Sequence, residues 1–154
     1  MGADPEYLAS LVREAVQGFS EHLGLAPVRL VEGEFLTRVQ VGPQHLQQDG
    51  YVHAGVLSTL ADHTAGYAAY SVVEPGRRIL TIEFKINFLA PADAEVVECR
   101  GVVLKRGRQV VVTEAEVFAL RGGSRTLCAK ALLSMANVPG DRVRPPQARR
   151  AATP

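Results

Sequence analysis

Hydrophobic residues recur every three to four positions over the first 24 residues, which is the spacing of one face of an α-helix. Asp4 followed by Pro5 is typical of a helix start, and Gly24 is typical of a helix end. The apolar positions are Leu8, Leu11, Val12, Ala15, Val16, Phe19 and Leu23. Residues 1–24 are therefore predicted to form an amphipathic N-terminal helix.

From residue 29 to residue 41 the period changes to two, which indicates a half-buried β-strand. The apolar positions are Val31, Phe35, Val39 and Val41, and the polar positions are Glu32, Glu34, Arg38 and Gln40. A polar turn region, residues 42–51, follows. The next stretch, residues 53–71, is long enough for a helix and is apolar nearly all round. We expect it to be a central helix that the rest of the domain covers.

Alternation with period two returns at residues 80–88, before Pro91 ends the strand. Leu80, Ile82, Phe84, Ile86 and Phe88 alternate with Thr81, Glu83, Lys85 and Asn87, and we expect this second row to face away from the helix. Three further β-rich runs cover residues 95–104, 109–120 and 125–136. The turns between them indicate successive hairpins.

Adjacent hairpins favour an antiparallel sheet, and one long apolar helix needs a concave sheet face to cover it. The predicted fold class is therefore α+β. It has an antiparallel sheet of about five to six strands wrapped around one long central helix, with an extra N-terminal helix. The expected divisions are residues 1–24 for that helix, 25–138 for the main domain and 139–154 for a disordered tail rich in Pro, Arg and Ala.

The length and the net charge limit the classes of function that the chain can have. A chain of 154 residues with 47% hydrophobic residues is expected to fold as one domain. The formal charge of +1 offers no broad basic surface for nucleic acid or an anionic membrane. The N-terminal residues lack a signal-peptide pattern, and no apolar run reaches about 18 residues. We therefore expect a cytoplasmic protein that binds neither nucleic acid nor membrane.

The two cysteines, Cys99 and Cys128, lie in strand-like apolar segments without a metal-binding or redox spacing. We predict that both are reduced core residues. The sequence has no zinc-site spacing, phosphate-binding glycine loop or nucleophile elbow. No metal and no cofactor are therefore predicted.

Asp62 is a single carboxylate within the uncharged stretch of residues 50–71. Because an unpaired carboxylate is costly to bury, such a residue normally has partners, a shifted pKa or a chemical role. On a helix it shares one stripe with small residues, namely Gly55, Ser58, Gly66 and Ala69. This stripe allows close packing against a neighbouring backbone, or a narrow slot that admits a ligand to the carboxylate.

His53 and Ala54 stand at the predicted start of the same helix, where unpaired backbone N–H groups favour negative charge. This position is suited to an oxyanion hole. Eight residues separate Ala54 from Asp62, which is about 12 Å along a helix, too far for both to touch one carbonyl carbon. If they act together, they come from different subunits. A two-fold dimer with antiparallel helices would build two identical sites.

The run from Gln47 to Asp62, followed by TIEFKINFLAPA and LKRGRQVVVTEAEVF, resembles the hotdog-fold acyl-CoA thioesterases of the phenylacetic acid degradation (PaaI-like) type. The resemblance covers roughly residues 28–138. That family has an Asn or Gln six residues before the His of a His-Gly-Gly turn, then an Asp or Glu on the central helix. Gln47, His53 and Asp62 occupy these positions. Ala54 replaces the first Gly, which can make the space beside the thioester carbonyl tighter.

The resemblance implies an acyl-CoA thioesterase in which Asp62 is the general base or the nucleophile. Gln47 would orient the water or the acyl carbonyl, and the Ala54 N–H would polarise the thioester oxygen. Thr81 matches a Ser or Thr that positions the reacting groups in some relatives. The turn of Lys105, Arg106, Gly107 and Arg108 would contact coenzyme A. The resemblance also suggests that the dimers pair into homotetramers.

Other interpretations of these residues remain open. Gln47 alone is also typical of a solvated turn. His53 can orient its loop by hydrogen bonding or take part directly in proton transfer. Residues 105–108 can be a charged turn that only aids solubility. His63 points about 100° away from Asp62 around the helix, so we do not pair them. His22 and His45 are interpreted as surface residues. Two other functions are a hydratase or dehydratase on the same fold and an acyl-CoA sensing module.

Overall fold

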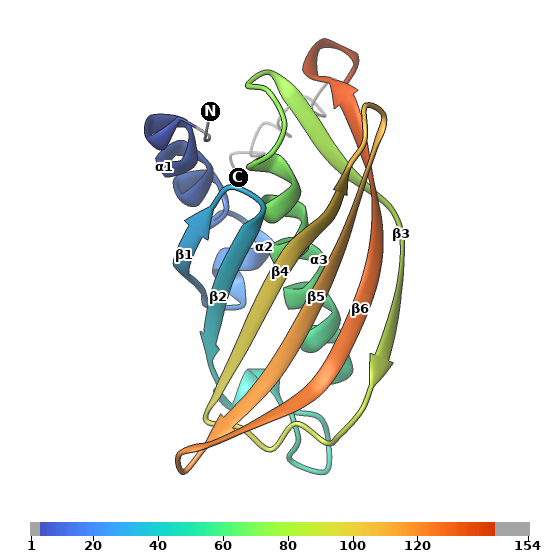
Figure 1. Cartoon of the computed structure of the whole chain (residues 1–154). Coiled ribbons are helices and arrows are strands. Elements are labelled where there is room, and N and C mark those ends of the chain that lie inside the picture. The colour runs from blue at the N-terminus through green and yellow to red at the C-terminus, as the bar shows by residue number, and fades with distance from the viewer. Residues whose placement is uncertain (1–3, 144–154) are drawn as a thin grey trace, which may run out of the picture.

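The computed structural model describes residues 4–143, which form a six-stranded antiparallel sheet around one long helix (Figure 1). The helices are α1 (Pro5–Glu14), α2 (Phe19–His22) and α3 (Ala54–Tyr70), with short 3-10 turns at Pro43–His45 and Gly140–Arg142. The strands are β1 (Leu25–Val31), β2 (Glu34–Gln40), β3 (Arg77–Phe88), β4 (Val96–Arg106), β5 (Val110–Arg121) and β6 (Ser124–Pro139). This arrangement confirms the predicted fold class.

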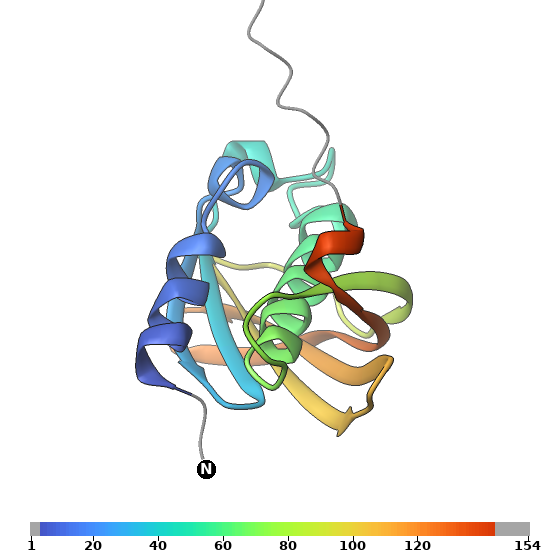
Figure 2. The ribbon, with the colours of Figure 1, turned by 90° about the horizontal axis from the view of Figure 1, so that it is seen from above.

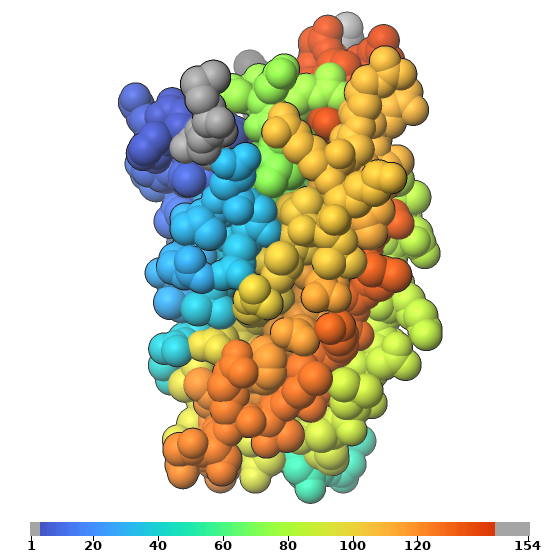
Figure 3. Space-filling model, in the orientation of Figure 1, coloured from blue at the N-terminus to red at the C-terminus, as the bar shows by residue number. Residues whose placement is uncertain are grey.

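The strand order across the sheet is β1-β2-β4-β5-β6-β3, so β1 and β3 are the two edges. Seen from above, the sheet curves around α3, and α1 lies outside the sheet beside β1 and β2 (Figure 2). The outer face of the sheet forms the surface in Figure 3, where β3 runs along the right edge. Among residues 4–143, no helix has the length and apolar character needed to cross a lipid bilayer.

The buried face of α3 is made of small and branched residues that allow a close approach to the sheet. Leu60, Ala61 and Ala65 are fully buried, and the hydroxyl groups of Thr37 and Thr64 form a buried hydrogen bond of 2.7 Å. A Cβ at Gly101 of β4 would lie only 2.7 Å from the backbone nitrogen of Ala65. Glycine at position 101 therefore lets β4 contact the helix backbone directly.

The N-terminal segment differs from the predicted single helix because α1 ends at Glu14 and the short α2 begins at Phe19. Gly18 adopts φ +59° at the break, a conformation that glycine adopts without steric cost. The buried hydroxyl of Ser20 donates to the carbonyl of Ala15 and stabilises this turn. The apolar spacing continued through the break because both helices pack against the same domain.

The predicted strand at residues 29–41 is a hairpin of two strands, because the chain turns at Gly33, where φ is +80°. The predicted apolar row is confirmed within β2, since Phe35 and Val39 are fully buried. Val31 belongs to β1 and is exposed, so the assignment of this residue to the same row was wrong.

The prediction that Thr81 faces away from the helix was also wrong. In the β3–β6 pairing, Thr81 lies opposite Met135 and Glu83 lies opposite Ser134, so Ile82 is an extra residue in a β-bulge. A bulge changes which face the side chains before and after it occupy. Thr81 therefore points toward α3, while Leu80 and Ile82 are 46% and 56% exposed.

The tail prediction falls mostly outside the described residues. Pro139 ends β6 and residues 140–142 form a 3-10 turn, whereas residues 144–154 are beyond the described part of the chain.

Candidate active site

The start of α3 presents a backbone N–H group toward solvent. His53 is the N-cap residue, and its Nδ1 atom accepts a hydrogen bond of 2.8 Å from the N–H of Gly55. The N–H groups of Val56 and Leu57 donate to the carbonyl of His53. Within residues 4–143, the N–H of Ala54 makes no hydrogen bond, so it is available to an acceptor on a ligand.

His53 therefore has the loop-orienting contact that the sequence left open as one of its two roles. Its Nδ1 acts as an acceptor toward the backbone, which places any ring proton on Nε2. The hydrogen bond fixes the ring over the first turn of α3. The side chain is exposed, so a contact between Nε2 and a ligand is sterically open.

Gln47 belongs to a tight turn just before this helix. Its N–H donates to the carbonyl of Tyr51 at 2.8 Å, and its Oε1 accepts from the N–H of Asp49. Its Nε2 has no partner among residues 4–143. The turn thus holds the Gln47 side chain through Oε1 and leaves its Nε2 donor available.

A pocket of about 540 Å³ lies at this end of the molecule. Gln47, His53 and Ala54 all line it, together with apolar residues such as Leu57 and Phe88. The structure therefore brings three of the predicted site residues together in one concave, partly apolar surface. Asp62 is not among the residues that line this pocket.

Asp62 lies near the middle of α3 and is bonded to β3. The hydroxyl of Thr81 donates to Asp62 Oδ1 at 2.7 Å and also approaches the sulfur of Met135 at 3.4 Å. Within the described chain the second oxygen, Oδ2, has no hydrogen-bond partner. Asp62 is half-buried, so the side of α3 that carries it is partly open.

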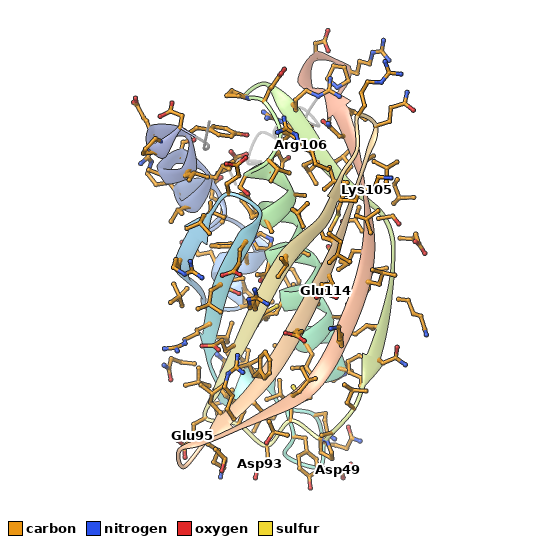
Figure 4. The ribbon with its side chains drawn as sticks, in the orientation of Figure 1. Asp49, Asp93, Glu95, Lys105, Arg106 and Glu114 are labelled. Atoms are coloured by element: carbon orange, nitrogen blue, oxygen red, sulfur yellow. The ribbon has the colours of Figure 1, made fainter. Side chains whose placement is uncertain are left out.

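The turn at residues 105–108 is at the opposite end of the molecule from Gln47. Figure 4 labels Lys105 and Arg106 at the upper end and Asp49, two residues after Gln47, at the lower end. Arg106, Gly107 and Arg108 line a second pocket of about 310 Å³, which Lys105 does not reach. Arg106 pairs with Val111, which is buried, so both side chains lie on the same face of the sheet. Because successive side chains of a strand alternate between the two faces, Lys105 lies on the opposite face.

Residues 49–126, about half of the chain, match the thioesterase superfamily. The chain belongs to this superfamily. Its structure is that of a hotdog-fold thioesterase, as the following relatives show.

Three relatives of this chain illustrate the similarity. A 1,4-dihydroxy-2-naphthoyl-CoA hydrolase of Listeria monocytogenes is 28% identical over 65% of this chain and 81% of its own. A thioesterase family protein of Silicibacter pomeroyi has a TM-score of 0.83 and 34% identity, covering 86% of this chain and 99% of its own. A conserved protein of Pseudomonas aeruginosa has a TM-score of 0.74 and 34% identity, covering 82% and 98%.

His45 supports the candidate site, although the sequence suggested a surface residue. It is 1% exposed, its Nδ1 accepts from the N–H of Gly42 at 2.9 Å, and its Nε2 bonds to the carbonyl of Leu23 at 2.9 Å. The N–H of His53 donates to the carbonyl of His45. His45 therefore anchors the loop that carries Gln47 and His53.

His63, Cys99 and Cys128 line neither of the two pockets. Among the described residues His63 makes no hydrogen bond to Asp62, as expected, and its Nε2 bonds to the carbonyl of Ala15 at 2.8 Å. Burial lowers the pKa of His63 below its usual value of 6.5. Cys99 and Cys128 are buried free thiols, which confirms their prediction as core residues. Burial raises the pKa of Cys99 to about 12 and that of Cys128 to about 11.

Proposed function

We propose that this thioesterase hydrolyses the thioester of an acyl-CoA or aryl-CoA to the free acid and coenzyme A. The observation that carries the proposal is the bond between Thr81 and Asp62, which fixes a half-buried carboxylate on the open face of α3 and leaves Oδ2 available. The name of the Listeria relative refers to an aryl-CoA hydrolase, which supports this substrate class. A PaaI-like subfamily assignment is part of the same proposal.

Asp62 acts either as the general base that takes a proton from water or as the nucleophile that attacks the carbonyl carbon. As a base, Asp62 Oδ2 accepts the proton while the water oxygen bonds to the carbonyl carbon. The carbon–sulfur bond then breaks, and coenzyme A leaves as a thiolate that takes up a proton. Thr81 orients the carboxylate for either route by donating to Oδ1.

The Ala54 N–H is the oxyanion donor in this proposal, and Gln47 orients the water or the acyl carbonyl through its available amide group. Both residues line the 540 Å³ pocket, whose apolar walls suit an acyl or aryl group. His53 holds the helix start in place through its bond to Gly55. The turn at residues 105–108, including Lys105, binds the anionic part of coenzyme A.

The proposed enzyme is at least a homodimer. Asp62 and the Ala54 N–H are about 12 Å apart along one helix, so one chain does not complete the site. The edge strand β3 exposes Leu80, Ile82 and Phe88, which suits pairing with a second copy of the chain. Antiparallel pairing would bring the Gln47 end of one subunit to the Arg106 end of its partner. Association of two dimers into a tetramer is a further step of this proposal.

A panel of aliphatic and aromatic acyl-CoAs, monitored by release of free thiol, tests the proposal. We expect saturable, enzyme-dependent release of one thiol and one free acid per substrate. Appearance of a hydrated acyl-CoA without thiol release would support the hydratase alternative instead. Tight binding without turnover would support the sensing module.

A further inference from the structure

The pocket at the upper end of the molecule concentrates positive charge from segments far apart in the sequence. It is lined by Val73, Glu74, Arg77, Arg106, Gly107, Arg108 and Asn137 and has a volume of about 310 Å³. Three guanidinium groups and one carboxylate give it a formal charge of +2, although the whole chain carries only +1. Such a pocket favours an anionic ligand.

Arg77, at the start of β3, is fixed in orientation by a single neighbour. Its Nε donates to Asn137 Oδ1 at 2.8 Å, and its Nη2 donates to the carbonyl of Asn137 at 2.7 Å. Among residues 4–143, Nη1 has no hydrogen-bond partner. A guanidinium held in this way loses little further side-chain entropy when it binds a phosphate.

Asn137 also holds the basic turn. Its Nδ2 donates to the carbonyl of Arg108 at 3.1 Å, and its backbone N–H donates to the carbonyl of Gln109 at 2.8 Å. One side chain therefore connects Arg77 on β3 to the segment that carries Arg106 and Arg108. Truncation of the Asn137 side chain would remove one hydrogen bond on each side, to Arg77 Nε and to the Arg108 carbonyl.

Two glycines fix the backbone around this pocket. A Cβ at Gly107 would lie 2.1 Å from the carbonyl oxygen of Val110, and a Cβ at Gly140 would lie 2.5 Å from that of Gly76. The N–H of Gly140 also donates to the Gly76 carbonyl at 2.9 Å. The pocket walls are thus tightly packed backbone segments, so its shape is formed before a ligand arrives.

We propose that Arg77 binds a phosphate group of the coenzyme A nucleotide and that Asn137 is a positioning residue for Arg77 and the 105–108 turn. This inference rests on the proposed thioesterase function and extends it to residues that lie outside the basic turn. It also defines the substrate class more narrowly. The enzyme selects thioesters carried by coenzyme A over the same acyl group on pantetheine, which lacks the nucleotide.

The experiment compares KM for a coenzyme A thioester and a pantetheine thioester with the same acyl group. For the wild-type enzyme we expect KM to be at least about tenfold lower for the coenzyme A thioester, as for charge-assisted phosphate contacts. Arg77→Ala and Asn137→Ala should each raise the coenzyme A KM about tenfold and leave the pantetheine KM and both kcat values within about twofold. Arg77→Lys should give an intermediate KM, because it keeps the charge but loses the planar fork.

Arg78→Ala is the matched control, because Arg78 is the next residue on β3, is exposed and lies outside the pocket. It should leave the KM ratio of the two substrates within about twofold. Equal KM values for the two substrates in the wild-type enzyme would overturn the proposal. An unchanged ratio in folded Arg77→Ala and Asn137→Ala proteins would overturn it as well.

Calorimetric binding of coenzyme A separates this inference from the proposed function. If the wild-type protein hydrolyses no thioester, the proposed function fails, but the pocket is still tested by this binding. Weaker binding to Arg77→Lys than to the wild-type protein would support the role of Arg77. Equal affinity of the two proteins for coenzyme A would contradict it.

Discussion

The two ends of the molecule differ in chemistry, although one helix and one sheet connect them. The lower pocket, lined by Gln47, His53 and Ala54, combines apolar walls with neutral polar groups. The upper pocket combines three arginines with a closely packed backbone at Gly107. Asp62 and Thr81 lie between these ends, on α3 and β3. Under the proposed function, one end serves the reacting acyl group and the other the anionic carrier.

This comparison predicts that changes near Asp62 lower kcat, while changes in the upper pocket raise KM. Interactions made only in the transition state affect kcat, whereas contacts to a remote part of the substrate bind ground state and transition state alike.

The largest effect is expected from Asp62→Asn, which keeps the size of the side chain but removes its basicity. We expect kcat to fall at least about 100-fold, as for loss of a general base, with normal folding. Steady-state thiol release and the unfolding temperature check this result. Asp4→Asn is the control, because Asp4 is an exposed carboxylate that lines neither pocket, and Asn can also cap a helix. Near-normal turnover of Asp62→Asn would assign Asp62 a structural role.

The next effect concerns the upper end. Arg106→Ala combined with Arg108→Ala should raise KM for the best acyl-CoA about tenfold or more and leave kcat nearly unchanged. Raising the ionic strength should produce the same trend in the wild-type enzyme, because salt screens exposed charge pairs. If KM is insensitive to both changes, the turn is only a charged surface segment.

A smaller effect is expected from Thr81→Val, which removes the donor to Asp62 Oδ1 and preserves the branched shape. We expect kcat to fall about tenfold, in line with the loss of one hydrogen bond to a charged group. Thr81→Ser should recover most of the activity, because the hydroxyl remains. A Thr81→Val enzyme as active as the wild type would show that the observed bond does not contribute to the reaction.

The smallest effect concerns His63, which follows Asp62 in sequence but contacts the α1–α2 connection. Because burial lowers its pKa in the folded state, the unfolded state binds a proton more readily as the pH falls below about 6.5. Stability should therefore decrease between pH 7.5 and pH 5.5. In His63→Gln this decrease should be smaller by about 2–4 °C in Tm, with kcat unchanged. Identical pH profiles of Tm would contradict the assignment.

Much of the fold and part of the site could be predicted from the sequence. The long apolar stretch identified α3, and period-two alternation identified most of the strands, because both patterns follow directly from which face is buried. The positions of Gln47, His53 and Asp62 could be assigned through family resemblance. The structure places two of these residues in one pocket and Asp62 beside Thr81.

The missed features depend on contacts between distant segments. The orientation of Thr81 depends on the bulge at Ile82, which shows only in the register with β6. Burial of His45 depends on the carbonyl of Leu23, 22 residues earlier. Arg77 and Asn137 are 60 residues apart and meet only because β3 pairs with β6. Local patterns carry no signal for such pairs.

The central claim is that each site uses Asp62 of one subunit and the Gln47–Ala54 end of the other. The most direct measurement mixes Asp62→Asn chains with Gln47→Ala chains, refolds them together and assays thiol release. Each mixed dimer should regain one intact site, so a random mixture should reach about a quarter of wild-type activity, well above either variant alone. Activity no higher than that of the single variants, with heterodimers demonstrated by native mass spectrometry, would show that each site lies within one chain.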